Sequence, residues 1–128
     1  MANFSMGVRG HVIVCIGLAL LAAAAVAYTR EPVRRVYSPN VAGAYAGQTI
    51  TVEGRASVYA ARNGVTFIDM GGSGPSSPFA AVIFKDDRAA FANIFRYDGK
   101  VIDVSGPVQK FRGKPQIILK SADQLQSK

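Results

Sequence analysis

Hydrophobic and polar residues alternate along much of residues 48–120, and this alternation predicts short β-strands. The longest alternation covers residues 48–62, and its apolar side consists of Ile50, Val52, Gly54, Ala56 and Val58. A period of two over this length indicates a strand with one buried face. Gly54, in its middle, predicts a sharp bend that would let one strand serve both halves of a closed sheet.

Turn residues divide the rest of this region into four further strands and one short helix. The strands are expected at residues 65–70, 79–84, 100–111 and 116–120. A helix between the third and fourth strands would cover one end of the sheet. Its apolar residues at helical spacing are Ala90, Phe91, Ile94 and Phe95. Asp86 or Asp87 would cap its first turn.

Three further expectations concern the connections, the tail and the aromatic residues. Residues 71–78 consist of turn-forming residues, which predicts a mobile connector. The tail after Ser121 is polar and is expected to fray. The phenylalanines within the elements are expected in the core, and these are Phe67, Phe79, Phe84, Phe91 and Phe95.

The N-terminal part follows a different pattern. Residues 12–27 form an uncharged apolar run that ends in small residues, the layout of a secretory signal peptide. The run is short for a membrane span, which needs roughly 20 residues. Basic residues follow it closely, however, so a retained N-terminal hydrophobic helix acting as a membrane anchor stays open as an alternative.

The sequence therefore divides into three parts. Residues 1–27 are a signal peptide or N-terminal membrane anchor, residues 28–46 are a linker or extended arm, and residues 47–125 are the folded domain. Both alternatives for the leader place the domain outside the cytoplasm, either periplasmic or secreted, or membrane-anchored. Contact with the membrane is expected only through residues 12–28, if the leader is uncleaved.

Charge and composition narrow the chemistry. The formal net charge is +7, which favours polyanionic partners such as nucleic acid, anionic lipid or acidic polysaccharide, although many basic domains are charged for solubility alone. The single cysteine, Cys15, and the single histidine, His11, both lie in the leader. The domain therefore lacks a disulfide, histidine acid–base chemistry, a cysteine nucleophile and the usual zinc ligands. We expect no enzyme activity, no catalytic residue, no metal and no cofactor.

An ordered set of short motifs adds a resemblance. The motifs are TVEGR at residues 51–55, GVTFIDMG at 64–71, FAAVIF at 79–84, VSG at 104–106 and FRGKPQI at 111–117. Together they resemble the nucleic-acid-binding OB-fold superfamily, and within it small bacterial OB domains that are secreted or membrane-anchored. The resemblance covers roughly residues 47–125. It implies an all-β fold with one short helix, a five-stranded OB-fold Greek-key barrel. The chain has no tryptophan, which strong single-strand binders often use for stacking.

The same resemblance indicates where a ligand would bind. OB barrels bind through the loop between strands 1 and 2, the loop between strands 4 and 5, and the sheet face between them. Basic loops occupy both positions, at residues 61–64 and 110–115. Single-stranded nucleic acid needs cations along its backbone and aromatic faces under its bases. The candidate binding residues are Arg55, Tyr59, Arg62, Asn63, Lys85, Lys110, Phe111, Arg112 and Lys114.

The leading hypothesis is non-catalytic binding of single-stranded DNA or RNA with little sequence preference. It requires the cations Arg62, Arg112 and Lys114 to share one face with at least one of Tyr59 and Phe111. The alternative is an envelope protein–protein interaction module, or an accessory subunit anchored by its N-terminal helix, which predicts an exposed apolar patch. Binding of an acidic glycan or anionic lipid through the same loops is a third possibility.

Overall fold

The computed structural model describes residues 34–128, and residues 35–128 form one unit. The predicted signal peptide or anchor lies outside the described residues. Among the residues that are described, no helix has the length and apolar character needed to cross a membrane.

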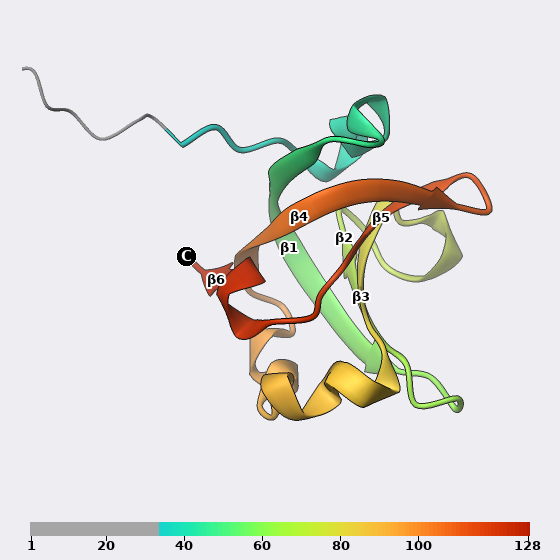
Figure 1. The fold of residues 1–128 in the computed structure, drawn as a ribbon, viewed down its shortest axis with the longest axis vertical. Helices are drawn as coiled ribbons and strands as arrows, with labels where there is room; N and C mark the ends of the chain where they lie inside the picture. The colour runs from blue at the N-terminus through green and yellow to red at the C-terminus, as the bar shows by residue number, and fades with distance from the viewer. Residues whose placement is uncertain (1–33) are drawn as a thin grey trace, which may run out of the picture. The chain divides into compact units, whose positions relative to one another are not determined.

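Five strands pair in a closed ring (Figure 1). They are β1 (Thr49–Ala60), β2 (Thr66–Met70), β3 (Phe79–Ile83), β4 (Val101–Phe111) and β5 (Lys114–Ile118). The β1–β2, β2–β3, β4–β5 and β1–β4 pairs are antiparallel, and the β3–β5 pair is parallel. The predicted mostly-β class with five ring strands is therefore confirmed.

The long first strand bends where it changes partner. Its first half pairs with β4 as far as Arg55, and its second half pairs with β2 from Ala56 onward. Gly54 stands just before this change, as the alternation predicts. A Cβ atom at Gly54 would lie only 2.8 Å from Cγ of Pro39, so the absence of a side chain lets the N-terminal segment pack against the bend.

Part of the segment predicted as a linker packs on the sheet. The Tyr37 N–H donates to the Thr51 carbonyl, and the Glu53 N–H donates to the Tyr37 carbonyl, each at 2.9 Å. A 3-10 helix, η1 (Pro39–Tyr45), then places Ala42 fully inside the core. The described residues of this segment are thus attached to β1.

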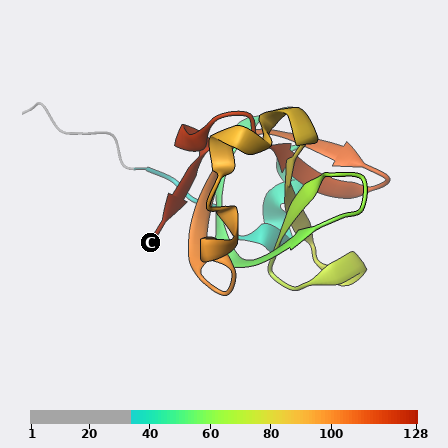
Figure 2. The same cartoon turned by 90° about the horizontal axis from the view of Figure 1, so that it is seen from below.

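One end of the ring is covered by two short 3-10 helices rather than by the single helix predicted (Figure 2). They are η3 (Lys85–Phe91) and η4 (Ile94–Tyr97). Phe91 and Ile94 are buried beneath them, whereas Phe95 is 49% exposed. The helix breaks because Asn93, with φ −109° and ψ 37°, leaves helical geometry between the two turns.

The predicted cap of this helix is wrong. The residue at the N-cap position is Phe84, and no side chain caps the turn. Asp86 and Asp87 lie inside the first turn of η3 instead. Their negative charge there suits the positive end of the peptide dipoles without a capping hydrogen bond.

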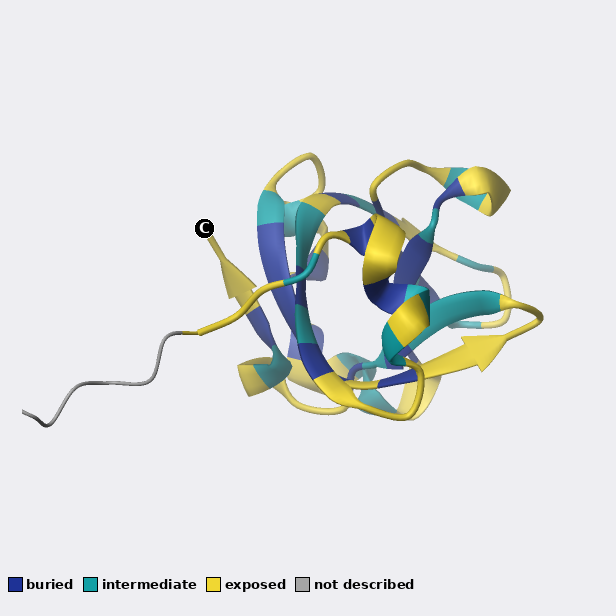
Figure 3. Ribbon diagram, turned by 90° about the horizontal axis from the view of Figure 1, so that it is seen from above, coloured by how far each residue is buried: buried dark blue, intermediate teal, exposed yellow. Residues whose placement is uncertain are grey.

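The C-terminal elements also differ from the predictions. The loop between β4 and β5 is a two-residue turn of Arg112 (φ 52°) and Gly113 (φ 80°), so β5 begins two residues earlier than expected. Positive φ at both positions is the geometry of a tight hairpin turn. Figure 3 shows the tip of this hairpin as exposed, beside strands whose residues are in part buried and in part intermediate.

The tail was expected to fray, and this is wrong. It forms a 3-10 turn, η5 (Ala122–Gln124), and a short strand, β6 (Leu125–Ser127), which pairs with β4 outside the ring. Ser121 and Gln124 form a reciprocal capping box, and Leu125 is buried. The sequence does not reveal this strand, because it is only three residues long and one of them, Leu125, is the only one that faces the core.

Candidate functional site

Aromatic side chains gather on the outer face of the sheet, near the β1–β2 hairpin. Tyr59 on β1 lies opposite Phe67 on β2, with the two ring centroids 5.3 Å apart and nearly parallel. Phe67 in turn lies opposite Val82 on β3. Because side chains alternate across a strand, these three face outward, while Ile68 and Ile83 face the core.

Beside this cluster runs a groove of about 190 Å³, which we call the aromatic groove. Its lining residues are Asn63, Val65, Phe67, Val82, Phe84, Phe111 and Gln116. It reaches from the β1–β2 hairpin, which supplies Asn63, to the end of β4, which supplies Phe111. Phe84 is 42% and Phe111 58% exposed, so their rings are accessible to a ligand.

The cations nearest the aromatic groove stand next to its lining residues in the sequence. Arg62 precedes Asn63, Lys85 follows Phe84 and Arg112 follows Phe111, and all three are exposed. The guanidinium carbon of Arg112 lies 5.2 Å from the centroid of the Phe111 ring. Lys85 packs beside Gly64 of the β1–β2 hairpin. The lining itself carries no charged residue.

Two of the candidate residues lie elsewhere. Arg55 donates to the carbonyl of Gly99 and lines a separate hollow that includes Asp98. It stands four residues before Tyr59, roughly 13 Å away along the strand. Lys110 lies on the opposite side of β4 from Phe111 and points toward Gly43 of η1, where an added Cβ would lie 3.8 Å from its Cε.

Lys114 is engaged in a buried contact that we call the Asp69–Lys114 clamp. Its Nζ lies 2.6 Å from Oγ of Ser77 and 3.6 Å from Oδ1 of Asp69, whose side chain is only 1% exposed. The Gly74 N–H donates to Oδ2 of the same carboxylate at 2.8 Å. The clamp therefore joins the outer face of the sheet to residues 71–78, the connector that was predicted to be mobile, and to its short helix η2 (Gly74–Ser76).

The clamp also affects Tyr59. Burial raises the pKa of its phenol, and the negative charge of Asp69 raises it further. Like any tyrosine, Tyr59 is neutral at physiological pH, and this shift moves its ionisation further above that pH.

The structure brings together Tyr59, Asn63 and Phe111 at the aromatic groove, with Arg62, Lys85 and Arg112 next to it. Sequence reasoning missed Phe67 and Phe84, which were expected in the core together with Phe95, and it did not consider Val82 or Gln116. The placement of Phe79 and Phe91 in the core is confirmed. The sequence did contain one indication that Phe67 faces away from the core. Side chains alternate along a strand, so Phe67 lies on the same side as the charged Asp69 and on the opposite side from Ile68.

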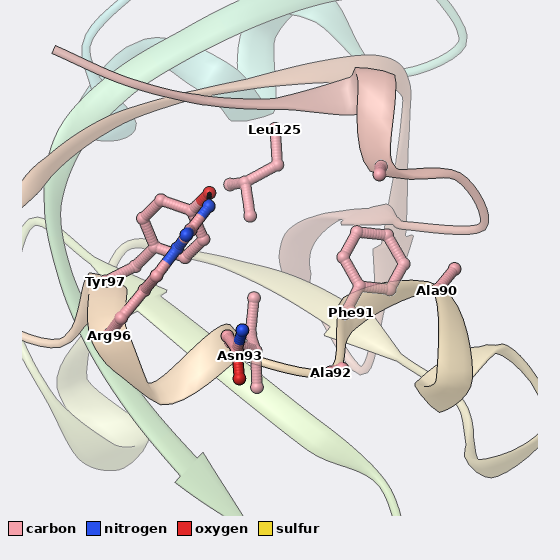
Figure 4. Close-up of a pocket in the computed structure, with 9 residues that line it drawn as sticks. Ala90, Phe91, Ala92, Asn93, Arg96, Tyr97 and Leu125 are labelled. Atoms are coloured by element: carbon pink, nitrogen blue, oxygen red, sulfur yellow. Dashed lines mark hydrogen bonds between the residues drawn. The ribbon is translucent and has the colours of Figure 1, made fainter.

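A third hollow lies between η3, η4 and the C-terminal tail, with a volume of about 210 Å³ (Figure 4). The close-up shows Arg96 lying along the ring of Tyr97, and the guanidinium donates to the Tyr97 hydroxyl at 2.7 Å. Its walls include the buried residues Phe91 and Leu125. This hollow shares no residue with the aromatic groove. Across residues 34–128, no three metal-ligating side chains gather to form a metal site.

Comparisons with known proteins bear on the fold. No protein-family model matches the chain, and no curated protein matches it. It is similar to a solved structure from Leishmania major Friedlin, provisionally assigned as an aspartyl-tRNA synthetase, with a TM-score of 0.52 and 13% identity. The match covers 78% of this chain and 22% of that one, so the chain spans about a fifth of that protein's length. At this identity the likeness shows the fold alone. With the closed five-strand ring, it is compatible with an OB-like fold.

Proposed function

We propose that the chain is a five-stranded OB-fold Greek-key barrel that binds single-stranded DNA or RNA without catalysing a reaction. The proposal rests on one observation: at the aromatic groove, the uncharged lining residues are separate from the positively charged residues. Aromatic and amide side chains line it, and three cations stand next to the lining residues rather than within it.

This separation matches the two parts of a nucleotide. Bases are flat and uncharged, so they stack on aromatic rings, and each stack contributes about 1–3 kcal/mol. Phosphates are anionic and pair with arginine and lysine outside the stacks.

The lining residues also support binding without catalysis and with little preference for nucleotide sequence. Every base has a face that can stack, so a stacking surface discriminates little between sequences. Residues 28–128 contain no histidine or cysteine. Asp69, two residues along β2 from the groove residue Phe67, is buried in the clamp. The solved structure that shares the fold is named for an enzyme that acts on tRNA, which is in line with a nucleic-acid ligand.

The proposed location is outside the cytoplasm. It rests on the apolar run at residues 12–27, which has the layout of a signal peptide or an anchor. Determining the N-terminal residue of the mature protein would test it, since a cleaved leader predicts a start near Tyr28 and a retained anchor predicts a start at Met1 or Ala2.

Binding can be tested by fluorescence anisotropy with labelled oligo-dT and the full chain, kept in mild detergent because of its apolar leader. Three phosphate contacts predict a log–log salt slope of about −2. Phe84→Ala and Phe111→Ala should each weaken binding about 5- to 150-fold, the equivalent of one lost stack. Phe95→Ala is the matched control, because Phe95 is similarly exposed but lies on η4.

A charge series completes the experiment. Arg112→Gln should flatten the salt slope by about 0.7, whereas Lys110→Gln, on the other side of β4, should change it little. The proposal fails if the wild type binds no oligonucleotide at low salt, or if Phe95→Ala weakens binding as much as Phe84→Ala does.

One observation favours a second candidate, the protein–protein interaction module. Tyr59, Phe84 and Phe111 are all exposed, and together they form the apolar patch that such a module predicts. Cross-linking from position 84 in intact cells distinguishes the two, because a protein partner would be captured there and lost when Phe111 is replaced. The neighbouring cations favour the nucleic-acid ligand.

A further inference from the structure

We propose that a bound single strand continues beyond the aromatic groove, across the end of the sheet and onto residues 74–78 of the connector between β2 and β3. This inference rests on the proposed function, because it names a second part of the same binding site. It gives the connector a role in binding in addition to joining two strands.

The aromatic groove has fewer exposed rings than a bound strand has bases. A single OB fold binds about 4–16 nucleotides of single-stranded nucleic acid, with bases stacked on aromatic side chains. The lining of the groove includes two well-exposed rings, those of Phe84 and Phe111. A strand of that length therefore extends past at least one end of the groove.

Another hollow, of about 340 Å³, adjoins the groove at the β4–β5 hairpin, and we call it the proline hollow. Its lining residues are Pro75, Ser77, Pro78, Arg112, Gly113, Lys114 and Pro115. Phe111 of the groove pairs across the hairpin with Lys114 of the hollow. Gln116 of the groove lies two residues from Lys114 on β5, so both side chains share the outer face. The groove and the hollow are therefore neighbouring parts of one surface.

The proline hollow suits the same kind of ligand as the groove. Arg112 lines it and also contacts the Phe111 ring, so a phosphate that follows a base stacked on Phe111 meets this guanidinium. The ammonium of Lys114 is turned toward Asp69 and Ser77, which makes Arg112 the accessible cation of the hollow. The three proline rings offer uncharged faces to sugars and bases. The hollow is open, which suits a polymer that enters and leaves it rather than an enclosed small molecule.

The other half of the connector suits a nucleic acid less well. Residues 71–73 line the separate hollow around Arg55, where the carboxylate of Asp98 would repel a phosphate. The guanidinium of Arg55 already donates to the carbonyl of Gly99. The path of the strand is therefore expected over residues 74–78 and not over residues 71–73.

Tryptophan fluorescence can locate the strand, because the chain contains no tryptophan of its own. Pro75→Trp places one at the proline hollow, and the control Ser73→Trp places one at the hollow around Arg55. Both positions are exposed, so both variants should fold, and far-UV circular dichroism checks this. Each full-length variant is mixed with oligo-dT of about 16 nucleotides, long enough to pass either end of the groove. Fluorescence anisotropy of the labelled oligonucleotide confirms that it is bound.

The expected result is a loss of tryptophan emission from Pro75→Trp on binding, because a stacked base quenches indole, with little change for Ser73→Trp. Amide hydrogen exchange of the wild type repeats the test without a substitution, and bound oligo-dT should slow exchange at residues 74–77. Unchanged emission from Pro75→Trp, equal losses at both positions or unchanged exchange would overturn this inference and leave the proposed function standing. Absence of binding to the wild type would overturn both.

Discussion

Replacing Lys114 by methionine should destabilise the protein without directly removing a ligand contact. The substitution keeps most of the length of the side chain but removes the charge that faces Asp69 and the hydrogen bond to Ser77. The carboxylate of Asp69 would then remain buried, with the Gly74 N–H as its remaining partner in the clamp.

The size of the effect follows from the burial of the two partners. Removing one member of a buried ion pair costs about 3–5 kcal/mol, because the other charge is left uncompensated. The side chain of Lys114 is 29% exposed, so water already screens part of the attraction and the lower end applies, about 3 kcal/mol. For a domain of this size that loss lowers the melting temperature by about 12–24 °C.

Urea unfolding followed by far-UV circular dichroism would measure this loss. Lys110→Met is the control, since it removes an exposed lysine on the other side of β4, and it should stay within about 0.5 kcal/mol of wild type. Adding Asp69→Asn to Lys114→Met should recover part of the stability, because a neutral amide needs no counter-charge. The reasoning is refuted if Lys114→Met is as stable as Lys110→Met. If folded Lys114→Met binds oligonucleotide more weakly than the wild type does, Lys114 contacts the ligand as well as Asp69.

Three further predictions concern other parts of the fold. Gly54→Ala should cost about 1–3 kcal/mol in urea unfolding, because its Cβ would lie 2.8 Å from Pro39. The hydrogen bond from Lys128 lowers the pKa of Glu53 below its ordinary value of 4.5. The stability that this interaction contributes is therefore fully present above pH 4.5 and is lost as the pH falls through the lowered pKa. Melting curves at successive pH values should therefore show wild type losing stability relative to Glu53→Gln on acidification. Finally, Tyr59→Phe should remove a phenolate absorbance step that lies above pH 10.0.

Each of these has an outcome that contradicts it. Gly43→Ala is the control for the glycine, since an added Cβ there meets nothing closer than 3.6 Å, and equal losses would exclude the contact with Pro39. Parallel pH profiles for wild type and Glu53→Gln would show that the ion pair contributes nothing. If the absorbance step that Tyr59→Phe removes lies below pH 10.0, neither burial nor Asp69 raises the pKa of the Tyr59 phenol.

The strands could be predicted because one of their two sides is consistently apolar. In β1 the inward residues alternate with polar ones, so both the strand and its bend at Gly54 were visible in the sequence. The tight turns were visible as well, and Gly113 has the positive φ expected of it.

The binding face was harder to predict, for a physical reason. Residues 79–84, which are β3 and the residue after it, are apolar on both sides, so alternation cannot distinguish the core residue Phe79 from the exposed Phe84. The candidate cations were chosen by their position in the sequence, but a lysine such as Lys114 can turn toward a buried carboxylate supplied by another strand. That contact depends on the connector folding back over the sheet, which no local pattern encodes.

The closed ring has a consequence for how the chain folds. Strands β1, β2 and β3 follow one another through short connections. The β1–β4 and β3–β5 pairings, by contrast, join residues far apart in the sequence, such as Thr49 with Pro107 and Ala80 with Gln116. Such distant pairings form slowly, and until β5 arrives both β3 and β4 expose an unpaired edge that invites aggregation. Phe111 and Gln116 come from the strands that complete the ring, whereas Tyr59 and Phe67 come from the early hairpin. The aromatic groove therefore exists only after closure, and any ligand that fills it stabilises the closed ring against reopening.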